Sequence, residues 1–323
     1  MNSILTFDTF YKSVLWGGSR IAAFKGEASK GNDIGESWEL SPMPGHESKV
    51  ADGPYKGTGL NEMIRRFGND IMGERLMKRC HGSFPLLVKF IDSNDDLSIQ
   101  VHPDDALAAA RHNSLGKTEM WYSIAPREGA GLYSGFSRRI TPEEYRQRVA
   151  DNTIVDVLAR HAATEGDVFF LPAGRVHSIA RGNFVLEIQE ASDVTYRIYD
   201  YDRRDASGKP RELHVEQAVD AIDFDDVNAA APTRPVFDAD GTALLARCSY
   251  FETSLMKVDG CRTIDLEGRD SFSILISVKG SLRLTGADGQ TVELPQGHTA
   301  LVPASLPRVT AEGCGELVSV FVP

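Results

Sequence analysis

Two stretches of the chain share one frame of glycine and proline. Residues 166–177 read GDVFFLPAGRVH, and residues 297–308 read GHTALVPASLPR. Each stretch predicts a strand that enters a tight turn containing proline, followed by a second strand that leaves the turn. The returning strand of the first copy presents His177, whereas the second copy has Arg308 at that point. The chain therefore contains an internal repeat of a β-rich unit, and only the first copy carries an imidazole there.

Most of the remaining sequence patterns are those of strands. Residues 85–91 form a short apolar run typical of a buried strand, and residues 97–102 alternate apolar and polar side chains. Helical patterns are few: residues 60–77 predict two short helices with a break at Gly68–Asp70. Further short helices are predicted at residues 103–110, 141–149 and 154–160. The expected fold class is mainly β, with a few short helices inserted between strands.

Length and composition predict the domain organisation. A chain of 323 residues is expected to hold about two domains. Proline, alanine and aspartate gather between Ala229 and Asp240, which is typical of a linker. We therefore place the boundary in this stretch. Residues 1–232 are expected to form a β-rich domain with helical insertions, and residues 233–323 a smaller all-β domain.

Charge and targeting patterns narrow the possible function classes. The formal net charge is −11, which disfavours electrostatic binding to nucleic acid or an anionic membrane, but not to a small anion in a local basic pocket. No apolar run approaches the roughly 18 residues of a membrane span, and residues 1–16 favour a strand over a signal peptide. The cysteines are interpreted as reduced thiols of a cytoplasmic protein; they are Cys80, Cys248, Cys261 and Cys314. The sequence leaves the oligomeric state open.

Four side chains could assemble into one metal site. Gln100 and His102 share one face of the alternating strand at residues 97–102. Glu119 follows 17 residues after His102, and His177 ends the first repeat. Two imidazoles, one carboxylate and one amide oxygen suit a divalent ion such as Zn²⁺, Mn²⁺, Co²⁺ or Fe²⁺. Such an ion can polarise a carbonyl and stabilise an enediolate, so one divalent metal is a candidate cofactor.

The spacing of these elements resembles that of a cupin, with Gln100 in place of the usual first histidine. The flanking segments narrow the resemblance to type I mannose-6-phosphate isomerases, in their short bacterial form. The segments that carry it are Trp16–Gly18, Glu36–Glu39, Phe84–Phe90, Leu97–Asp105, Gly116–Trp121, Leu171–His177 and Glu190–Arg197. The last part of the chain matches only as a degenerate second cupin. The resemblance implies two cupin (jelly-roll) domains with short helical insertions, and an enzyme that interconverts mannose 6-phosphate and fructose 6-phosphate.

The resemblance also implies roles for single residues. Arg197 falls on the family's catalytic arginine, and Asp193 falls on its acidic neighbour. Lys117 falls on an active-site lysine, and Ser98 and Lys89 fall on positions that line the substrate pocket. Zn²⁺ is the expected ion, because four residues fall on the family's zinc ligands: Gln100, His102, Glu119 and His177.

These residue types suit an aldose–ketose isomerisation. The reaction moves a proton between C2 and C1 through an enediol-type intermediate, whose negative charge a metal and Arg197 would stabilise. The base stays open among a metal-bound water, Asp193 and Lys117. The substrate phosphate requires cations or hydroxyl donors, for which the candidates are Ser98, Lys89, Lys117 and Arg197.

Purely structural roles are the alternative for three of these residues. Lys89 could end a strand with its ammonium in water, and Asp193 could cap a turn. Arg197 could form a structural ion pair with Asp200 or Asp202.

Two other functions compete with the isomerase for the whole chain. One is an Fe²⁺-dependent cupin oxygenase, which is disfavoured by the amide ligand Gln100 and by the cationic side chains of Lys117 and Arg197. The other is a sugar-phosphate-binding regulator that has kept the metal site. No DNA-binding motif or basic domain in the sequence supports that second function.

Overall fold

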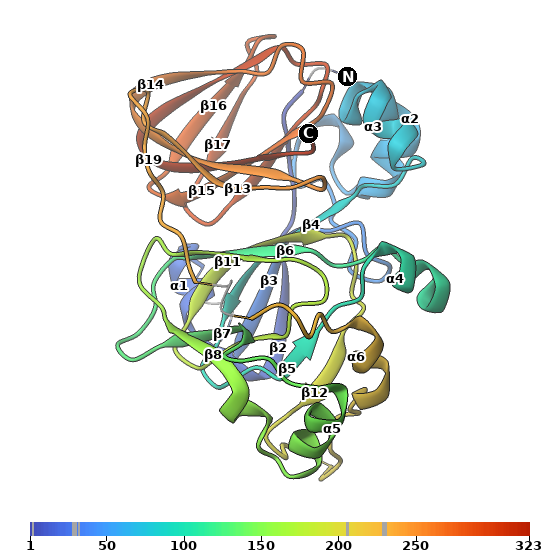
Figure 1. Ribbon diagram of the computed structural model, residues 1–323. Helices are drawn as coiled ribbons and strands as arrows, with labels where there is room; N and C mark the ends of the chain where they lie inside the picture. The colour runs from blue at the N-terminus through green and yellow to red at the C-terminus, as the bar shows by residue number, and fades with distance from the viewer. Residues whose placement is uncertain (2, 28–30, 32, 205–206, 228–230) are drawn as a thin grey trace.

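The strands form two β bodies that are stacked on one another (Figure 1). The computed structural model describes residues 1, 3–27, 31, 33–204, 207–227 and 231–323. The lower body in Figure 1 contains strands β2 to β12, and the upper body contains strands β13 to β19. The prediction of a mainly β fold with short helices is confirmed.

The lower body is built from two antiparallel sheets. Over the described residues, one sheet has six strands and the other has five. The six-stranded sheet has the order β2 (Phe10–Gly18), β3 (Ile34–Leu40), β4 (Leu86–Asp92), β11 (Phe184–Glu190), β6 (Glu119–Ser123) and β9 (Val168–Leu171). The five-stranded sheet has the order β12 (Tyr196–Tyr199), β5 (Ile99–Val101), β10 (His177–Ile179), β7 (Gly131–Phe136) and β8 (Leu158–Ala162).

The upper body is one antiparallel sheet that also takes in the start of the chain. The main strand order is β1 (Leu5–Thr6), β18 (Thr299–Val302), β15 (Ser273–Lys279), β19 (Arg308–Phe321), β14 (Glu252–Asp265) and β13 (Thr242–Arg247). The long β19 also pairs with β16 (Leu282–Gly286), which in turn pairs with β17 (Thr291–Leu294). Leu5 of β1 lies opposite Leu301 of β18. The domain boundary between residues 232 and 233 stays a prediction, and residues 229–230 of the predicted linker lie outside the described residues.

The helices are short and lie around the two bodies (Figure 1). The α-helices are α1 (Arg20–Phe24), α2 (Leu60–Met72), α3 (Glu74–Arg79), α4 (Asp105–His112), α5 (Pro142–Ala150) and α6 (Val215–Ala221), and two 3₁₀ turns are η2 (Gly53–Tyr55) and η3 (Ile154–Val157). Both α4 and α5 begin close to the predicted positions and carry side-chain caps, because Asp104 accepts from the amide of Leu107 and Thr141 from that of Glu144.

Two helix predictions are wrong in detail. The break in the helical stretch 60–77 falls at Gly73, which has φ +85°, and only a kink at Phe67 lies near the predicted position. A glycine adopts this φ without the steric cost that a side chain would add. Residues 154–160 form the turn η3 and then strand β8, because pairing with β7 overrides their helical pattern.

The six-stranded sheet is buried on both faces at its centre. Strands β4 and β11 are buried along their whole length. On the outer face, Phe90 and Leu186 pack into one core with Ile274 and Val320 of the upper body. On the inner face, Ile91 belongs to a separate core inside the lower body. The upper body therefore covers the outside of this sheet, and the inner face is left to line the interior of the sandwich.

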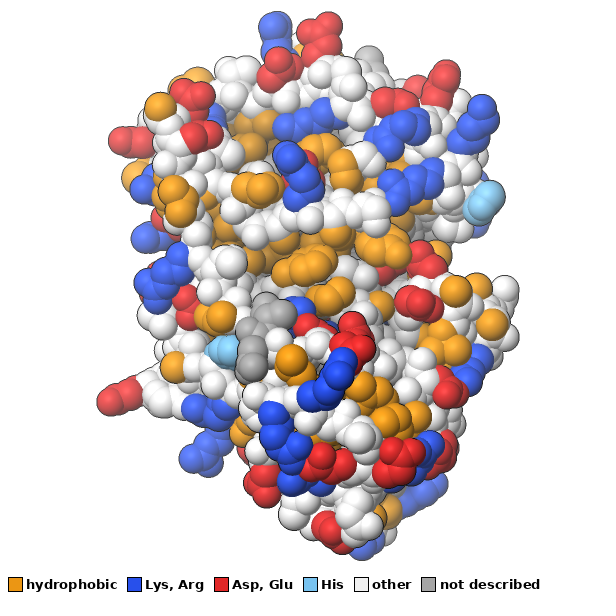
Figure 2. Space-filling model, in the orientation of Figure 1, with side chains coloured by type: hydrophobic (Ala, Val, Ile, Leu, Met, Phe, Trp, Pro, Cys, Tyr) orange, Lys and Arg blue, Asp and Glu red, His pale blue; other side chains and the backbone are white. Residues whose placement is uncertain are grey.

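The visible surface has no large region of one charge sign. Figure 2 shows Lys and Arg side chains interspersed with Asp and Glu, and a band of hydrophobic side chains where the two bodies meet. Among the helices of the described residues, none combines the length and the apolar character that a membrane crossing requires.

Candidate active site

The register of the five-stranded sheet brings predicted site residues into one row. On β5, Gln100 lies opposite His177 of β10 on one side and opposite Arg197 of β12 on the other. Residues directly opposite each other in an antiparallel sheet project from the same face. The row therefore presents an imidazole, an amide and a guanidinium side by side toward the interior of the sandwich.

A second row crosses the inner face of the six-stranded sheet. Lys89 of β4 lies opposite Trp38 of β3 and opposite Glu187 of β11. Glu187 in turn lies opposite Trp121 of β6, and its carboxylate accepts a hydrogen bond from the indole nitrogen at 2.9 Å. The two sheets therefore enclose a polar interior in a place where a jelly roll could otherwise be filled by apolar side chains.

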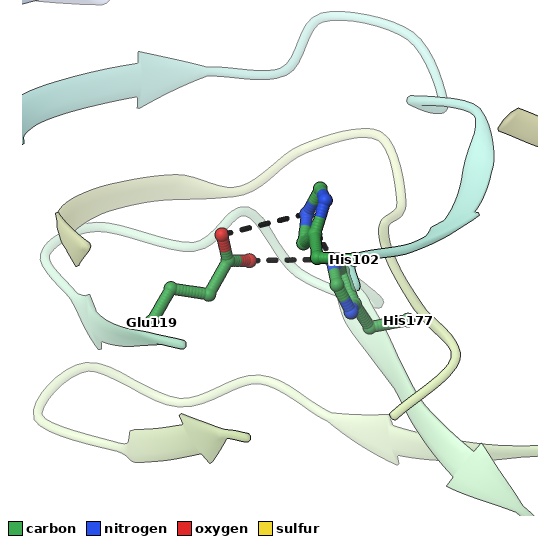
Figure 3. A group of neighbouring side chains, drawn as sticks. All are labelled: His102, Glu119 and His177. Carbon is green, nitrogen blue, oxygen red and sulfur yellow. Dashed lines mark hydrogen bonds and ion pairs between the residues drawn. The ribbon is translucent and has the colours of Figure 1, made fainter. Parts of the chain in front are cut away.

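Three buried side chains form a cluster with the atoms of a metal site. His102, Glu119 and His177 each offer one ligand atom, and these atoms lie within 4.8 Å of one another. Figure 3 shows the Glu119 carboxylate facing both rings, with Oε1 3.2 Å from His177 Nε2 and Oε2 3.6 Å from His102 Nε2. The side-chain nitrogen Nε2 of Gln100 lies 3.3 Å from His177 Nε2 and 3.5 Å from His102 Nε2.

Backbone carbonyls orient both imidazoles. His102 Nδ1 lies 2.9 Å from the carbonyl oxygen of Val194, and His177 Nδ1 lies 2.8 Å from that of Arg175. A ring that donates its Nδ1 proton to a carbonyl presents an unprotonated Nε2, which is the form that binds a metal. Both Nε2 atoms face Glu119 at the centre of the cluster.

Burial shifts the pKa values of all three side chains in the cluster. Burial, reinforced by the positive charge of Lys117, lowers the pKa of His102 well below its ordinary value. Burial also lowers the pKa of His177 to about 3, so both rings are neutral near pH 7. Burial raises the pKa of Glu119 to about 7, against the opposing effect of Lys117. A bound cation would favour the ionised carboxylate and compensate for its burial.

The side chains of the cluster suit a divalent ion. Both carboxylate oxygens of Glu119 are buried and accept no hydrogen bond of good geometry among the described residues, although Lys117 Nζ lies 3.1 Å from Oε2. Buried polar atoms of this kind call for a partner, since their desolvation is costly. Two neutral imidazoles, one carboxylate and one amide are hard to borderline ligands, which suit Zn²⁺ and similar ions.

A cavity of about 510 Å³ opens beside this cluster. Six of the predicted site residues line it: Lys89, Ser98, Gln100, Lys117, Asp193 and Arg197. The other three, which are His102, Glu119 and His177, lie buried next to it, with 1%, 0% and 1% of their surfaces exposed. Lys117 connects the two parts, because its Nζ lies 3.1 Å from both Glu119 Oε2 and His102 Nε2. The structure therefore brings all nine predicted residues together, whereas their roles stay predictions.

The contacts of Lys89 and Arg197 differ from those expected if the two residues had purely structural roles. Lys89 does not end a strand in water: its Nζ lies 3.2 Å from Glu187 Oε2 inside the cavity. Burial would lower the pKa of Lys89, but nearby carboxylates, chiefly that of Glu187, outweigh it and hold the pKa above its ordinary value. Asp200 pairs with Arg203 and Arg211, while Arg197 donates to the carbonyl oxygen of Glu212 at 2.9 Å.

Several cavity residues were missed by the sequence reasoning. Glu187, Trp38, Lys12 and Arg211 line the cavity beside the predicted residues. Glu187 left a signal, since it is a lone carboxylate inside the apolar stretch 184–188. A buried charge in such a stretch calls for a partner of opposite sign, and Lys89 is a cation inside the apolar stretch 85–91.

Two family descriptions match separate parts of the chain. Residues 4–125 match "Phosphomannose isomerase type I, catalytic domain", and residues 241–322 match "Mannose-6-phosphate isomerase, cupin domain". The second match agrees with the prediction that the last part of the chain is a cupin.

Relatives of similar length extend the likeness to almost the whole chain. A mannose-6-phosphate isomerase of Streptococcus mutans is 32% identical over an alignment of 309 positions that covers 94% of each chain. The mannose-6-phosphate isomerase ManA of Bacillus subtilis is 32% identical over an alignment of 323 positions that covers 97% of each chain. The crystal structure of a mannose 6-phosphate isomerase from Bacillus subtilis superposes with a TM-score of 0.85 at 32% identity, covering 98% of this chain and 99% of that one. With the family's motifs and this fold in one chain, the protein belongs to the type I mannose-6-phosphate isomerases.

Proposed function

We propose that the protein interconverts mannose 6-phosphate and fructose 6-phosphate through an enediol-type intermediate, with one divalent metal as cofactor. The proposed ligands are Gln100, His102, Glu119 and His177, and Zn²⁺ is the expected ion. The observation that carries the proposal is the convergence of two sets of groups. A buried cluster with metal-binding atoms lies against a cavity whose walls hold Lys117 and Arg197. A bound ion would polarise a substrate oxygen and stabilise the negative charge of the intermediate.

Lys117 and Arg197 are the proposed catalytic cations. Lys117 reaches both the cavity and the cluster, so its ammonium can donate to a substrate oxygen that lies between them. Arg197 lines the cavity, and its Nε is buried without a hydrogen-bond partner among the described residues. Burial and the nearby charge of Arg211 lower the pKa of Arg197 from its very high ordinary value. The guanidinium stays charged near pH 7 and would hold the developing negative charge.

The proton that moves between C2 and C1 requires a base at the cavity wall. Asp193 and Lys117 both line the cavity and are the side-chain candidates. Asp193 would act as a carboxylate base if it reaches C2. Lys117 Nζ is already engaged by Glu119 Oε2 and His102 Nε2, each at 3.1 Å, which supports Asp193 as the base.

The proposed substrate is a sugar phosphate because the cavity wall carries several donors. Ser98, Lys89, Lys117 and Arg197 are the proposed phosphate-binding and sugar-binding groups. Lys89 contributes less net positive charge than Arg197 does, since Glu187 lies 3.2 Å from its Nζ. Binding of a dianionic phosphate is therefore expected to depend most on the guanidinium. A cytoplasmic location is proposed with this function and stays a prediction.

A coupled assay tests the proposal directly. Formation of fructose 6-phosphate from mannose 6-phosphate is measured for the purified protein, for the chelator-treated protein, and after addition of Zn²⁺, Mn²⁺ or Co²⁺. We expect the chelator to abolish turnover and one metal to restore it. Glu119→Gln should lose both bound metal and turnover, while Glu293→Gln, which changes an exposed carboxylate paired with Arg283, should lose neither. A folded, metal-loaded protein without turnover would contradict the proposal.

A further inference from the structure

The segment that leads into β6 carries Lys117 and is followed directly by Glu119, and the backbone amides of the segment are all hydrogen-bonded. The amide of Gly116 donates to Asp105 Oδ1 at 2.8 Å. The amide of Lys117 donates to the carbonyl oxygen of Pro103 at 3.1 Å. The amide of Thr118 donates to Glu190 Oε2 at 2.7 Å. Two carboxylates outside the proposed catalytic set therefore hold this segment, residues 116–118, from the side.

Glu190 forms two hydrogen bonds with Thr118 of this segment. Its side chain accepts from the amide of Thr118, and its own amide donates to the carbonyl oxygen of Thr118 at 3.1 Å. Only 3% of its surface is exposed. Glu190 lies three residues beyond Glu187 on β11 and therefore projects from the opposite face of that strand, away from the substrate cavity. Its two hydrogen bonds to the segment go to the backbone of Thr118, which lies between Lys117 and Glu119.

Close packing limits how residues 116–118 can move. A Cβ at Gly116 would lie 2.6 Å from the backbone nitrogen of Asp105 and 2.7 Å from the backbone carbon of Asp104. These distances leave no room for a side chain, so glycine allows the segment to lie directly on the start of α4. The Asp105 carboxylate can reach the Gly116 amide because of this approach.

The upper body reaches the same carboxylate. Tyr250, in the connection between β13 and β14, donates its hydroxyl proton to Asp105 Oδ2 at 2.9 Å. The two oxygens of Asp105 are therefore divided between the two bodies, one for Tyr250 and one for Gly116. A continuous chain of contacts leads from the upper body through Asp105 and Gly116 to Lys117.

We propose that Tyr250, Asp105 and Glu190 are positioning residues, which fix the segment 116–118 so that the Lys117 ammonium and the Glu119 carboxylate keep their places. The inference rests on the proposed isomerase function and deepens it. The upper body then has a part in the reaction, although it contributes no group to the cavity through these contacts. Loss of one of these bonds would allow Lys117 more freedom, which should affect turnover more than binding, because positioning matters most in the transition state.

The test compares Tyr250→Phe with a matched control. Tyr55→Phe removes a hydroxyl from a tyrosine whose ring packs on Phe67, far along the chain from the segment. We expect Tyr250→Phe to lower kcat by about 3- to 10-fold, as for the loss of one hydrogen bond, with KM within about 2-fold of the wild type. Tyr55→Phe should leave both unchanged. If the loss of kcat in Tyr250→Phe is explained by a lower Tm, that is, by a smaller fraction of folded protein, the inference is overturned.

Hydrogen exchange gives a second measurement that does not need activity. The amides of Gly116 and Thr118 should exchange about 3- to 10-fold faster in Tyr250→Phe than in the wild type, while those of β4 should be unchanged. If the wild type does not convert mannose 6-phosphate, the proposed function fails, and this exchange measurement still decides whether Tyr250 fixes the segment. Unchanged exchange and unchanged kcat in Tyr250→Phe would overturn the inference.

Variants at Glu190 separate positioning from bulk stability. Glu190→Gln keeps an acceptor for the Thr118 amide and should keep kcat close to the wild-type value. Glu190→Met has a similar length without an acceptor and should lower kcat by about 3- to 10-fold, in parallel with faster exchange at Thr118. Equal kcat values for the two variants would overturn the role of Glu190.

Discussion

At the scale of single residues, Arg197 is distinguished by a buried donor that has no hydrogen-bond partner among the described residues. That donor is its Nε, while another of its nitrogens donates to the carbonyl oxygen of Glu212. Arg197→Lys keeps the charge but loses the planar set of donors. We expect kcat to fall by about 100-fold, with a smaller change in KM and unchanged bound metal. Arg127→Lys, at an exposed arginine that contacts Asn94, is the control.

Glu190 predicts a pH dependence of stability with a definite sign. Burial, reinforced by the charge of Asp105, raises the pKa of Glu190 from 4.5 to about 8. Between these values the folded protein holds a proton that the unfolded chain has lost, so the contribution of Glu190 to the free energy of unfolding falls as the pH rises from 4.5 to about 8. Each pKa unit corresponds to about 1.4 kcal/mol. Urea unfolding at pH 5, 6, 7 and 8 should show a steeper loss for the wild type than for Glu190→Gln. Parallel profiles would contradict the prediction.

The sequence predicted which residues meet at the site better than it predicted how they pair. The alternation at residues 97–102 and the frame at 166–177 offered Gln100, His102 and His177 as candidates, and the resemblance to the family selected them as ligands. The pair of Lys89 and Glu187 could not be found in this way, because it depends on β4 lying beside β11 in one particular register. Register between distant strands is set by the packing of the whole sheet, and a shift of one residue would turn either side chain to the other face.

At the scale of elements, helix α3 begins without a capping side chain of its own. Asp270 of the upper body supplies the cap, because its carboxylate accepts from the amides of Glu74 at 2.8 Å and Arg75 at 3.0 Å. Asp270→Ala should lower the free energy of unfolding by about 1 kcal/mol, whereas Asp270→Asn should lose less, since asparagine caps nearly as well. Chemical denaturation of both variants checks the order, and an equal loss in the two would contradict it.

The errors in the predicted elements have a common physical origin. The helical stretch at 60–77 is interrupted at Gly73, where the chain meets Asp270 of the upper body. Residues 154–160 form a strand because β7 lies beside them and takes up their backbone hydrogen bonds. In both cases a distant segment decides the local structure, and such a partner is not visible in a local sequence pattern.

At the scale of the whole molecule, the two copies of the repeat have the same frame but different contacts. In the first copy β9 and the turn after it lead to His177, which begins β10 and faces the proposed metal cluster. In the second copy β18 and its turn lead to Arg308, which begins β19 and is exposed. The start of the second copy instead contacts the lower body. The carbonyl oxygen of Gly297 accepts from Lys25 at 2.5 Å, and His298 Nε2 lies 3.3 Å from Glu27.

Substitution of Lys25 should show how much this contact contributes to the free energy of unfolding. Lys25 follows α1, is 5% exposed, and pairs with Glu39 at 2.6 Å while also donating to Gly297. Lys25→Met would leave the buried Glu39 carboxylate without its cation, at a cost of about 3–5 kcal/mol in the free energy of unfolding. Changing Glu39 to Leu as well removes that unpaired charge, so the double variant should be more stable than Lys25→Met alone.

A double-mutant cycle by urea unfolding measures this coupling. Glu39 lies in β3 of the lower body, so of these two Lys25 contacts only the hydrogen bond to Gly297 spans the two bodies. If that bond helps to join them, Lys25→Met should also separate the single unfolding transition expected for the wild type into two. The double variant lacks the same bond, so it should keep two transitions while it regains part of the lost free energy of unfolding. Additive effects of the two substitutions, with one transition in every variant, would mean that the shared apolar core of Phe90, Ile274 and Val320 joins the bodies without help from Lys25.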